Sequence, residues 1–476
     1  MIIHLPSNHA RLSRFATFCT MVIALMTILA LVYASHKLRP ASDDYCFGWI
    51  SAQYGLIGGT AHWWNSWNGY LYSMFMGNLL VGLPLAHLPF GIASAVSFLF
   101  ALVLLGVTVI ALAPKVFVAS FNRIFIFCLT IFLWWVFLWA PESFGLALVK
   151  NPPIATNENM LMAQGIVHWQ TLNGEYVSAL LVLLLVWRTL WGRVRQTNVM
   201  LYAAFFLLGL VTGQANITLA VSVIACALLA SLICLFFQIS ISRARIFQCI
   251  CFLSAVLISM LLSHFLSPGA QLRKEMLGSS FQMSAFGIVN LVYFVSSFSF
   301  KLWFLSYFNV GALLTIFIAA SYAFLCPGFI SGQQVQKLVK LGIGLGIFAL
   351  IQILVNRLSE AFVYVGYWHY VSALVCIFIS LLFFGLAIGR LLRNKVDSQT
   401  YQMLAAACLI GGLLVGVSSA IFMVEVIYLR ETSWALGAAP TEGVTDIEDP
   451  KGWQMNCWNH LNELRPAAIT RQPIAK

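Results

Sequence analysis

Long apolar runs recur along nearly the whole chain, and polar segments of varying length separate them. Because an α-helix needs about 20 apolar residues to cross the hydrocarbon core of a bilayer, each run predicts a membrane span. The first run is too long for the apolar region of a signal peptide, and no small-residue cleavage pattern follows it, so we expect a retained span. Eleven spans are predicted, at residues 15–35, 90–113, 124–140, 176–191, 199–215, 217–238, 246–266, 303–325, 340–356, 371–389 and 401–429.

The composition agrees with this pattern. Of the 476 residues, 61% are hydrophobic and only 9% are charged, and the mean hydropathy is +0.90, far outside the range of soluble domains. We therefore expect an all-α polytopic membrane protein with about eleven transmembrane helices. The cysteines lie mostly in apolar runs, where they act as small apolar side chains. Cys46 and Cys457 lie in polar segments on the same predicted side, which makes them the candidate pair for a disulfide.

The charges predict the orientation of the spans. If the N-terminus is cytoplasmic, fourteen cations fall on the inner side against one acid, Asp397, as the positive-inside rule requires. These cations are Arg11, Arg14, Lys115, Arg123, Arg188, Arg193, Arg195, Arg243, Arg245, Lys337, Lys340, Arg390, Arg393 and Lys395. The net charge of +11 therefore reflects membrane orientation, and we expect a lipid bilayer and no nucleic acid as partner.

The outer side carries the long connections, at residues 36–89, 141–175 and 267–302. We divide the chain into a transmembrane domain, residues 1–429 with these outer loops, and a short outer tail, residues 430–476. The stretch 284–300 is apolar, but a span there would place two lysines outside, so we expect it to be re-entrant or interfacial. Long loops on one face of a membrane protein usually carry function.

The first outer loop contains two candidate motifs. In RPASDDYCFGW, Asp43 and Asp44 are adjacent acids in a chain with only 15 acidic residues. In HWWNSWNGYLYS, the candidates Trp64, Trp67, Asn68 and Tyr70 combine aromatic faces with hydrogen-bonding groups, a combination that suits sugar rings. An interfacial belt of aromatic residues is the alternative interpretation.

The later outer segments add further candidates. Trp169 and Tyr176 lead into the fourth span, and SPGAQLRKEM places Arg273 and Lys274 after a Pro-Gly turn that is suited to a phosphate. Cations that reach toward lipid headgroups are the alternative for this pair. The last candidates, Arg357, Glu360 and His369, lie at the outer ends of two spans, where an ion pair between helices is as good an explanation as a site; all are numbered as in the printed chain.

Some classes of protein are excluded by missing motifs. The chain has no H-E-x-x-H, no Walker loop and no G-x-S-x-G, so a metalloprotease, an ATPase or a hydrolase of those types has no support. No charged residue lies in the middle of a predicted span, so an ion-coupled transporter lacks its usual relay.

The order of these motifs over residues 15–390 resembles the GT-C superfamily of integral-membrane glycosyltransferases, and within it the bacterial O-antigen glucosyltransferases. The resemblance implies a hexosyl- or pentosyltransferase of the bacterial inner membrane whose active site faces the periplasm. It also implies a polyprenyl-phosphate sugar donor, a glycan or lipid-linked acceptor, a catalytic first-loop acid, and outer-loop cations on the phosphate. The chain differs from related sequences at Tyr70, where they tend to have arginine, and at Ala270, where many have asparagine.

We therefore expect Asp44 to be the catalytic base and Asp43 to orient it or to cap a helix. The alternative is that Ser42 or Asp43 merely caps a short helix that begins near Tyr45. We expect Arg273, helped by Lys274, to stabilise the leaving phosphate. The acids are compatible with a divalent cation, although no ligand spacing demands one, so the use of a metal stays open. The competing functions are an O-antigen polymerase and a transporter of lipid-linked oligosaccharides.

Overall fold

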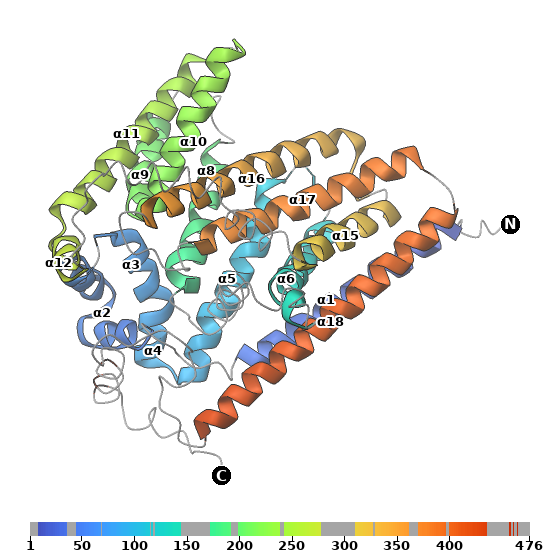
Figure 1. Ribbon diagram of the computed structural model, residues 1–476, viewed down its shortest axis with the longest axis horizontal. Helices are drawn as coiled ribbons and strands as arrows, with labels where there is room; N and C mark the ends of the chain where they lie inside the picture. The colour runs from blue at the N-terminus through green and yellow to red at the C-terminus, as the bar shows by residue number, and fades with distance from the viewer. Residues whose placement is uncertain are drawn as a thin grey trace.

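The computed structural model describes residues 8–35, 44–67, 69–114, 116–117, 120–143, 172–191, 199–238, 242–277, 310–326, 329–360, 370–396 and 399–435, with Cys457, His460 and Leu464. Within these residues every regular element is a helix, and there is no strand (Figure 1). This confirms the predicted all-α class for the described part of the chain. The apolar stretch 284–300 lies outside the described residues.

The elements follow the printed chain in a simple order. They are α1 (Asn8–Ser35), α2 (Asp44–Ser66), α3 (Leu71–Gly77), the π-helix η1 (Asn78–Gly82), α4 (Leu83–His87), α5 (Phe90–Leu112), α6 (Ser120–Ser143), the π-helix η2 (Leu172–Ser178), α8 (Ala179–Trp191), α9 (Val199–Gly213), α10 (Ile217–Phe236), α11 (Arg243–Leu266), α12 (Pro268–Leu277), α15 (Val310–Leu325), α16 (Gly332–Glu360), α17 (Val371–Lys395) and α18 (Gln399–Ala435). The last of these continues past the predicted boundary at residue 429.

Eight of the described helical stretches are long and apolar enough to cross a membrane. They are Leu12–Tyr33, Phe90–Leu112, Asn173–Trp191, Ile217–Phe236, Arg243–Leu266, Gly332–Asn356, Val371–Lys395 and Gln399–Ser418, and each overlaps a predicted span. The other three predicted spans coincide with shorter apolar helices, Asn122–Leu138, Val199–Gly213 and Val310–Leu325. The protein is therefore an all-helical polytopic membrane protein.

The helix α17 forms the centre of the bundle, between α15 and α16. Nearly all of its residues are buried, and its Phe378 ring lies 5.0 Å from the Trp134 ring and 5.6 Å from the Phe137 ring, both of α6. In contrast, α10 is mostly exposed, as expected of a helix whose apolar side chains face lipid. It belongs with α9 and α11 to a group at one side of the molecule (Figure 1).

The two ends of the bundle differ in charge. Figure 1 shows α1 and α18 running alongside each other in the same direction, and α17 ends where α18 begins. Arg14, near the start of α1, and Arg393 and Lys395, in the last turn of α17, therefore lie at the same end. The opposite end of α1 leads to the segment that contains α2. This arrangement agrees with the predicted segregation of cations and acids.

The predicted outer loop at residues 36–89 is largely helical, which corrects the picture of an irregular loop. Its described residues form α2, α3, η1 and α4, and Leu71–His87 is a further apolar helical stretch. The physical reason is that Met74, Leu80 and Leu85 pack with residues of α2 into a second hydrophobic core. This compact helical layer positions the candidate site.

Candidate functional site

Asp44 is the first residue of α2, and its side chain is 0% exposed. A buried carboxylate is costly unless it is compensated, and the unpaired backbone N–H groups at a helix N-terminus favour a negative charge. The start of α2 also agrees with the predicted helix near Tyr45, so the same residue has both a structural and a chemical role. The neighbouring Asp43 lies outside the described residues.

The helix α2 consists of two arms that meet at a kink. Gly55 has φ of 65°, a left-handed conformation that favours glycine, and it separates a first arm that begins at Asp44 from a second arm that ends at Ser66. Asn78 of η1 joins the arms and is fully buried. Its Oδ1 accepts from Ser51 Oγ at 3.0 Å, and its Nδ2 donates to Thr60 Oγ1 at 3.3 Å. We call these three residues the Asn78 clamp.

We expect Asn78→Ala to lower the free energy of unfolding by about 1–3 kcal/mol, because the buried Ser51 hydroxyl loses its acceptor. The thermal midpoint of the purified protein in detergent should fall by several degrees. The matched control is Asn65→Ala, which changes an exposed asparagine in the second arm of α2 and should leave the midpoint unchanged. Equal midpoints for the two variants would show that the clamp does not hold the arms.

The aromatic segment after the kink divides into core and surface residues. Trp63 is 2% exposed, and its ring lies 4.8 Å from the Phe47 ring of the first arm, so this tryptophan is part of the core. The candidates Trp64, Trp67 and Tyr70 are partly buried, which leaves part of each side chain accessible, whereas Asn68 lies outside the described residues. Between them, a Cβ at Gly69 would lie 2.4 Å from the Ser263 carbonyl oxygen, so this close approach requires glycine.

A hydrogen bond joins α2 to α12. Ser267 Oγ donates to the Trp64 carbonyl oxygen at 2.8 Å and accepts from the Ala270 backbone N–H at 3.2 Å. Ser267 thus acts as the N-cap of α12 and ties this helix to the second arm of α2. Arg273 and Lys274 lie on α12, and their side chains are outside the described part of the structure. The phosphate candidates and the acid candidate therefore belong to elements that are in direct contact.

Loss of this bond should be measurable. We expect Ser267→Ala to cost about 1 kcal/mol of stability through the lost cap and to lower the activity of the protein more than its stability, because α12 loses its tie to α2. The control is Ser231→Ala, whose hydroxyl bonds only within its own helix. The tie is not functional if both variants retain the same activity per folded molecule.

The π-helix η2 brings another acid to this layer. Glu175 is 8% exposed, and a Cβ built on Gly77 would lie 2.6 Å from the Phe47 ring and 3.2 Å from Glu175 Cγ, so the glutamate lies close to the ring of Phe47. Phe47 is one turn from Asp44 on α2, so Glu175 packs near the face that carries Asp44. Our sequence reasoning placed Glu175 among the outer acids but did not select it. Its position directly before a predicted span was the available signal.

Tyr176 follows Glu175 and is partly buried against the main core. Its partner in the sequence motif, Trp169, lies outside the described residues. A nearby tyrosine, Tyr72 of α3, donates its hydroxyl to the Ala179 carbonyl oxygen at 3.1 Å and joins the first and second predicted loops. Burial raises the pKa of Tyr72, so this hydroxyl stays protonated and remains a donor.

The turn between α9 and α10 supports the same layer. Gln214 Oε1 accepts from the Leu71 N–H at 3.2 Å, and its Nε2 donates to the Ser259 carbonyl oxygen at 3.0 Å, so its amide fastens α3 to α11. Asn216 caps α10 by accepting from the Thr218 N–H at 2.8 Å. Both side chains therefore do ordinary turn chemistry. Close by in sequence to the aromatic segment, burial lowers the pKa of His62, which keeps its imidazole neutral at neutral pH.

The remaining candidates are only partly placed. Arg357 and Glu360 lie in the last turns of α16, with side chains outside the described part, and His369 lies outside the described residues altogether. The helix itself packs against α10 and α17, so its end belongs to the bundle rather than to the α2 layer. Within the described residues, no three His, Cys, Asp or Glu side chains form a group suited to a metal ion.

Comparison of the chain with protein-family models, with curated proteins and with solved structures found no match. The fold and the site define a polytopic helical membrane protein in which a buried acid, partly accessible aromatic residues and a capped helix with two cations share one layer.

Proposed function

We propose that this protein is an inverting membrane glycosyltransferase of the GT-C type that transfers a sugar from a polyprenyl-phosphate donor to a glycan or lipid-linked acceptor. The observation that carries the proposal is the hydrogen bond from Ser267 to Trp64, because it joins the helix with Arg273 to the helix that begins at Asp44. A base and a phosphate-binding cation on adjoining helices are the two groups that this reaction needs.

In the proposed reaction, Asp44 removes the proton from an acceptor hydroxyl. The acceptor oxygen forms a bond to the anomeric carbon as the bond from that carbon to the phosphate oxygen breaks, and attack from the opposite face inverts the configuration. The electron pair of the broken bond leaves on the polyprenyl phosphate, which needs charge stabilisation rather than a proton. Arg273 supplies this stabilisation, with Lys274 beside it.

The sugar would lie against the aromatic residues of the layer. Trp64, Trp67 and Tyr70 are partly accessible and come from adjoining elements, which suits stacking on a sugar ring. Tyr176, Asn68 and Trp169 are proposed as further contacts, and Arg357, Glu360 and His369 as more distant contacts to the acceptor. If a divalent cation takes part, the acids of the layer, Asp44 and Glu175, are its candidate ligands.

We place this layer at the periplasmic face of the bacterial inner membrane and propose eleven spans, with α6, α9 and α15 crossing as well as the eight longer helices. Two observations support the placement. The cations near the start of α1 and the end of α17 lie at the opposite end of the bundle from α2. Cys46 of α2 forms a disulfide with Cys457, and disulfides persist in oxidising compartments such as the periplasm.

The proposal is tested by release of polyprenyl phosphate. Purified protein in lipid nanodiscs is incubated with a panel of synthetic polyprenyl-phosphate sugars and a bacterial lipid extract as the source of acceptor. We expect time-dependent release of polyprenyl phosphate with at least one donor, and none with empty nanodiscs. No release with any donor would contradict the proposal and favour a polymerase or a transporter.

A further inference from the structure

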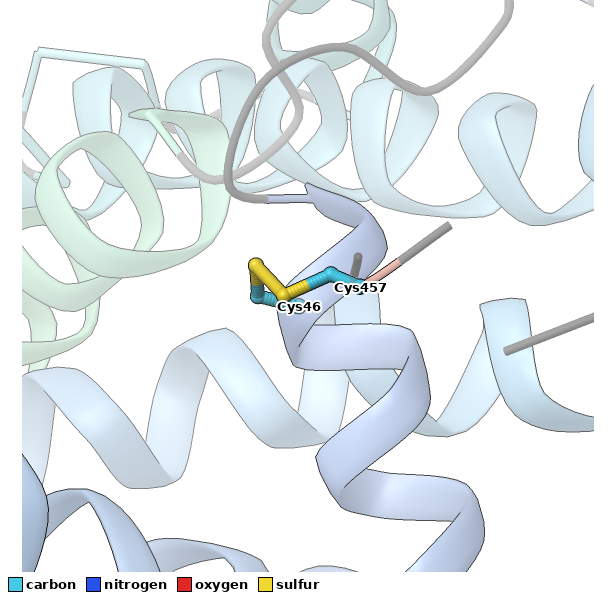
Figure 2. Close-up of a disulfide and its surroundings, with 2 residues drawn as sticks. All are labelled: Cys46 and Cys457. Atoms are coloured by element: carbon cyan, nitrogen blue, oxygen red, sulfur yellow. A yellow bond between two sulfur atoms is a disulfide. The ribbon is translucent and has the colours of Figure 1, made fainter. Parts of the chain in front are cut away.

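The C-terminal residues Cys457 and His460 are attached to the first arm of α2. Cys457 forms a disulfide with Cys46 across 411 residues of sequence, and the two cysteines are 3% and 0% exposed (Figure 2). One turn further along α2, the rings of Trp49 and His460 stack at a centroid distance of 5.0 Å. We call Cys457 and His460 the C-terminal strap.

The strap holds one particular face of α2. Cys46 and Trp49 are three residues apart on a helix and therefore share a face. Asp44 and Phe47 share a different face, about 160–200° away, since consecutive residues on a helix are about 100° apart. The Phe47 face packs against Gly77 of α3 and Glu175 of η2. The first arm is therefore enclosed between the strap on one side and α3 with η2 on the other.

This enclosure matters because of where Asp44 lies. The first four N–H groups of a helix have no partner within the helix, so a helix end frays unless other contacts hold it. Asp44 is the first residue of α2, and the disulfide attaches two residues later. The arm also ends at the Gly55 kink, so its own backbone does not fix it firmly from the other side.

We propose that the C-terminal strap is a positioning device that holds the first arm of α2, and with it Asp44, in the orientation that catalysis requires. The inference rests on the proposed function for the role of Asp44, but the mechanical part stands on the contacts alone. Cys46, Cys457 and His460 are then positioning residues. Because a misplacement of about 1 Å in a catalytic group can lower a rate by about 10²-fold, a loosened arm should lower turnover strongly.

The test compares Cys457→Ser with Cys249→Ser, which removes an exposed free cysteine. We expect Cys457→Ser to lower kcat for sugar transfer by about 10–100-fold, with the KM for the donor changed less than about twofold because the donor phosphate is held elsewhere. The pH profile of kcat should also shift, since the surroundings of Asp44 change. Cys249→Ser should match the wild type in all three measurements.

Two further measurements keep the inference testable if Cys457→Ser folds poorly or the protein transfers no sugar. His460→Ala should lower kcat in the same direction, and His460→Phe, which keeps a ring on Trp49, should restore it. Hydrogen exchange of the α2 amides at residues 45–50 should be faster in Cys457→Ser and in His460→Ala than in Cys249→Ser. Faster exchange in a protein without transfer activity would support the strap and contradict the proposed function. Unchanged exchange, kcat and pH profile in all strap variants would overturn the strap.

Discussion

Replacement of Asp44 by asparagine should lower sugar transfer by about 10²–10⁴-fold, the usual contribution of a general base. Asparagine has nearly the same size and keeps hydrogen-bonding groups at the start of α2, but it does not accept the proton of the acceptor hydroxyl. The position is fully buried at the N-terminus of a helix, so the protein should still fold and insert. The measurement is the rate of transfer per folded molecule, with folding checked by gel filtration.

The matched control is Asp43→Asn, which changes the adjacent acid in the same way. We expect a smaller decrease, because neighbouring residues on a helix point about 100° apart and do not reach the same atom. A larger decrease in Asp43→Asn than in Asp44→Asn would assign the role of base to Asp43. Full transfer by both variants and by the double variant would contradict a carboxylate mechanism at this site.

Replacement of Arg273 by alanine should lower transfer by about 10²–10³-fold, the effect of removing one donor that stabilises developing charge. Arg273 lies on α12, whose N-cap Ser267 is hydrogen-bonded to α2. A guanidinium binds a phosphate through two parallel hydrogen bonds, so Arg273→Lys should recover only part of the activity. The effect should appear mainly in kcat, because charge on the phosphate grows as the sugar departs.

Lys274→Ala is the matched control for charge, since it removes one cation from the next position of the same helix. We expect a decrease of less than about tenfold, as fits a helper that acts as a compact point charge. If Lys274→Ala and Arg273→Ala each left transfer unchanged, these cations would instead contact lipid headgroups, the alternative that the sequence also allows.

The spans could be predicted because the physical requirement for crossing a bilayer is a simple one. A run of about 20 apolar residues is visible in any sequence, and each predicted span coincides with an apolar helix. The stretch Leu71–His87 was missed because a glycine, a proline and polar aromatic residues interrupt it. These features are typical of loops, and only contacts with α2 and α5 explain why the segment is helical and buried.

The site was predictable at its residues but not at its supports. Asp44 and the strap cysteine Cys457 were found because acids are scarce in this chain and few cysteines lie outside apolar runs. The Asn78 clamp was not found, since its partners Ser51 and Thr60 are 27 and 18 residues away and a buried asparagine has no local signature. Such polar contacts depend on how α2 folds back over η1, which sequence periodicity does not encode.

The most direct test of the account is transfer of a radiolabelled sugar from a polyprenyl-phosphate donor to purified acceptor lipid, measured for the wild type, Asp44→Asn and Arg273→Ala in matched membranes. The account predicts transfer by the wild type and loss of transfer in both variants at equal expression. Transfer by Asp44→Asn at the wild-type rate, or none by the wild type with any donor, would contradict it.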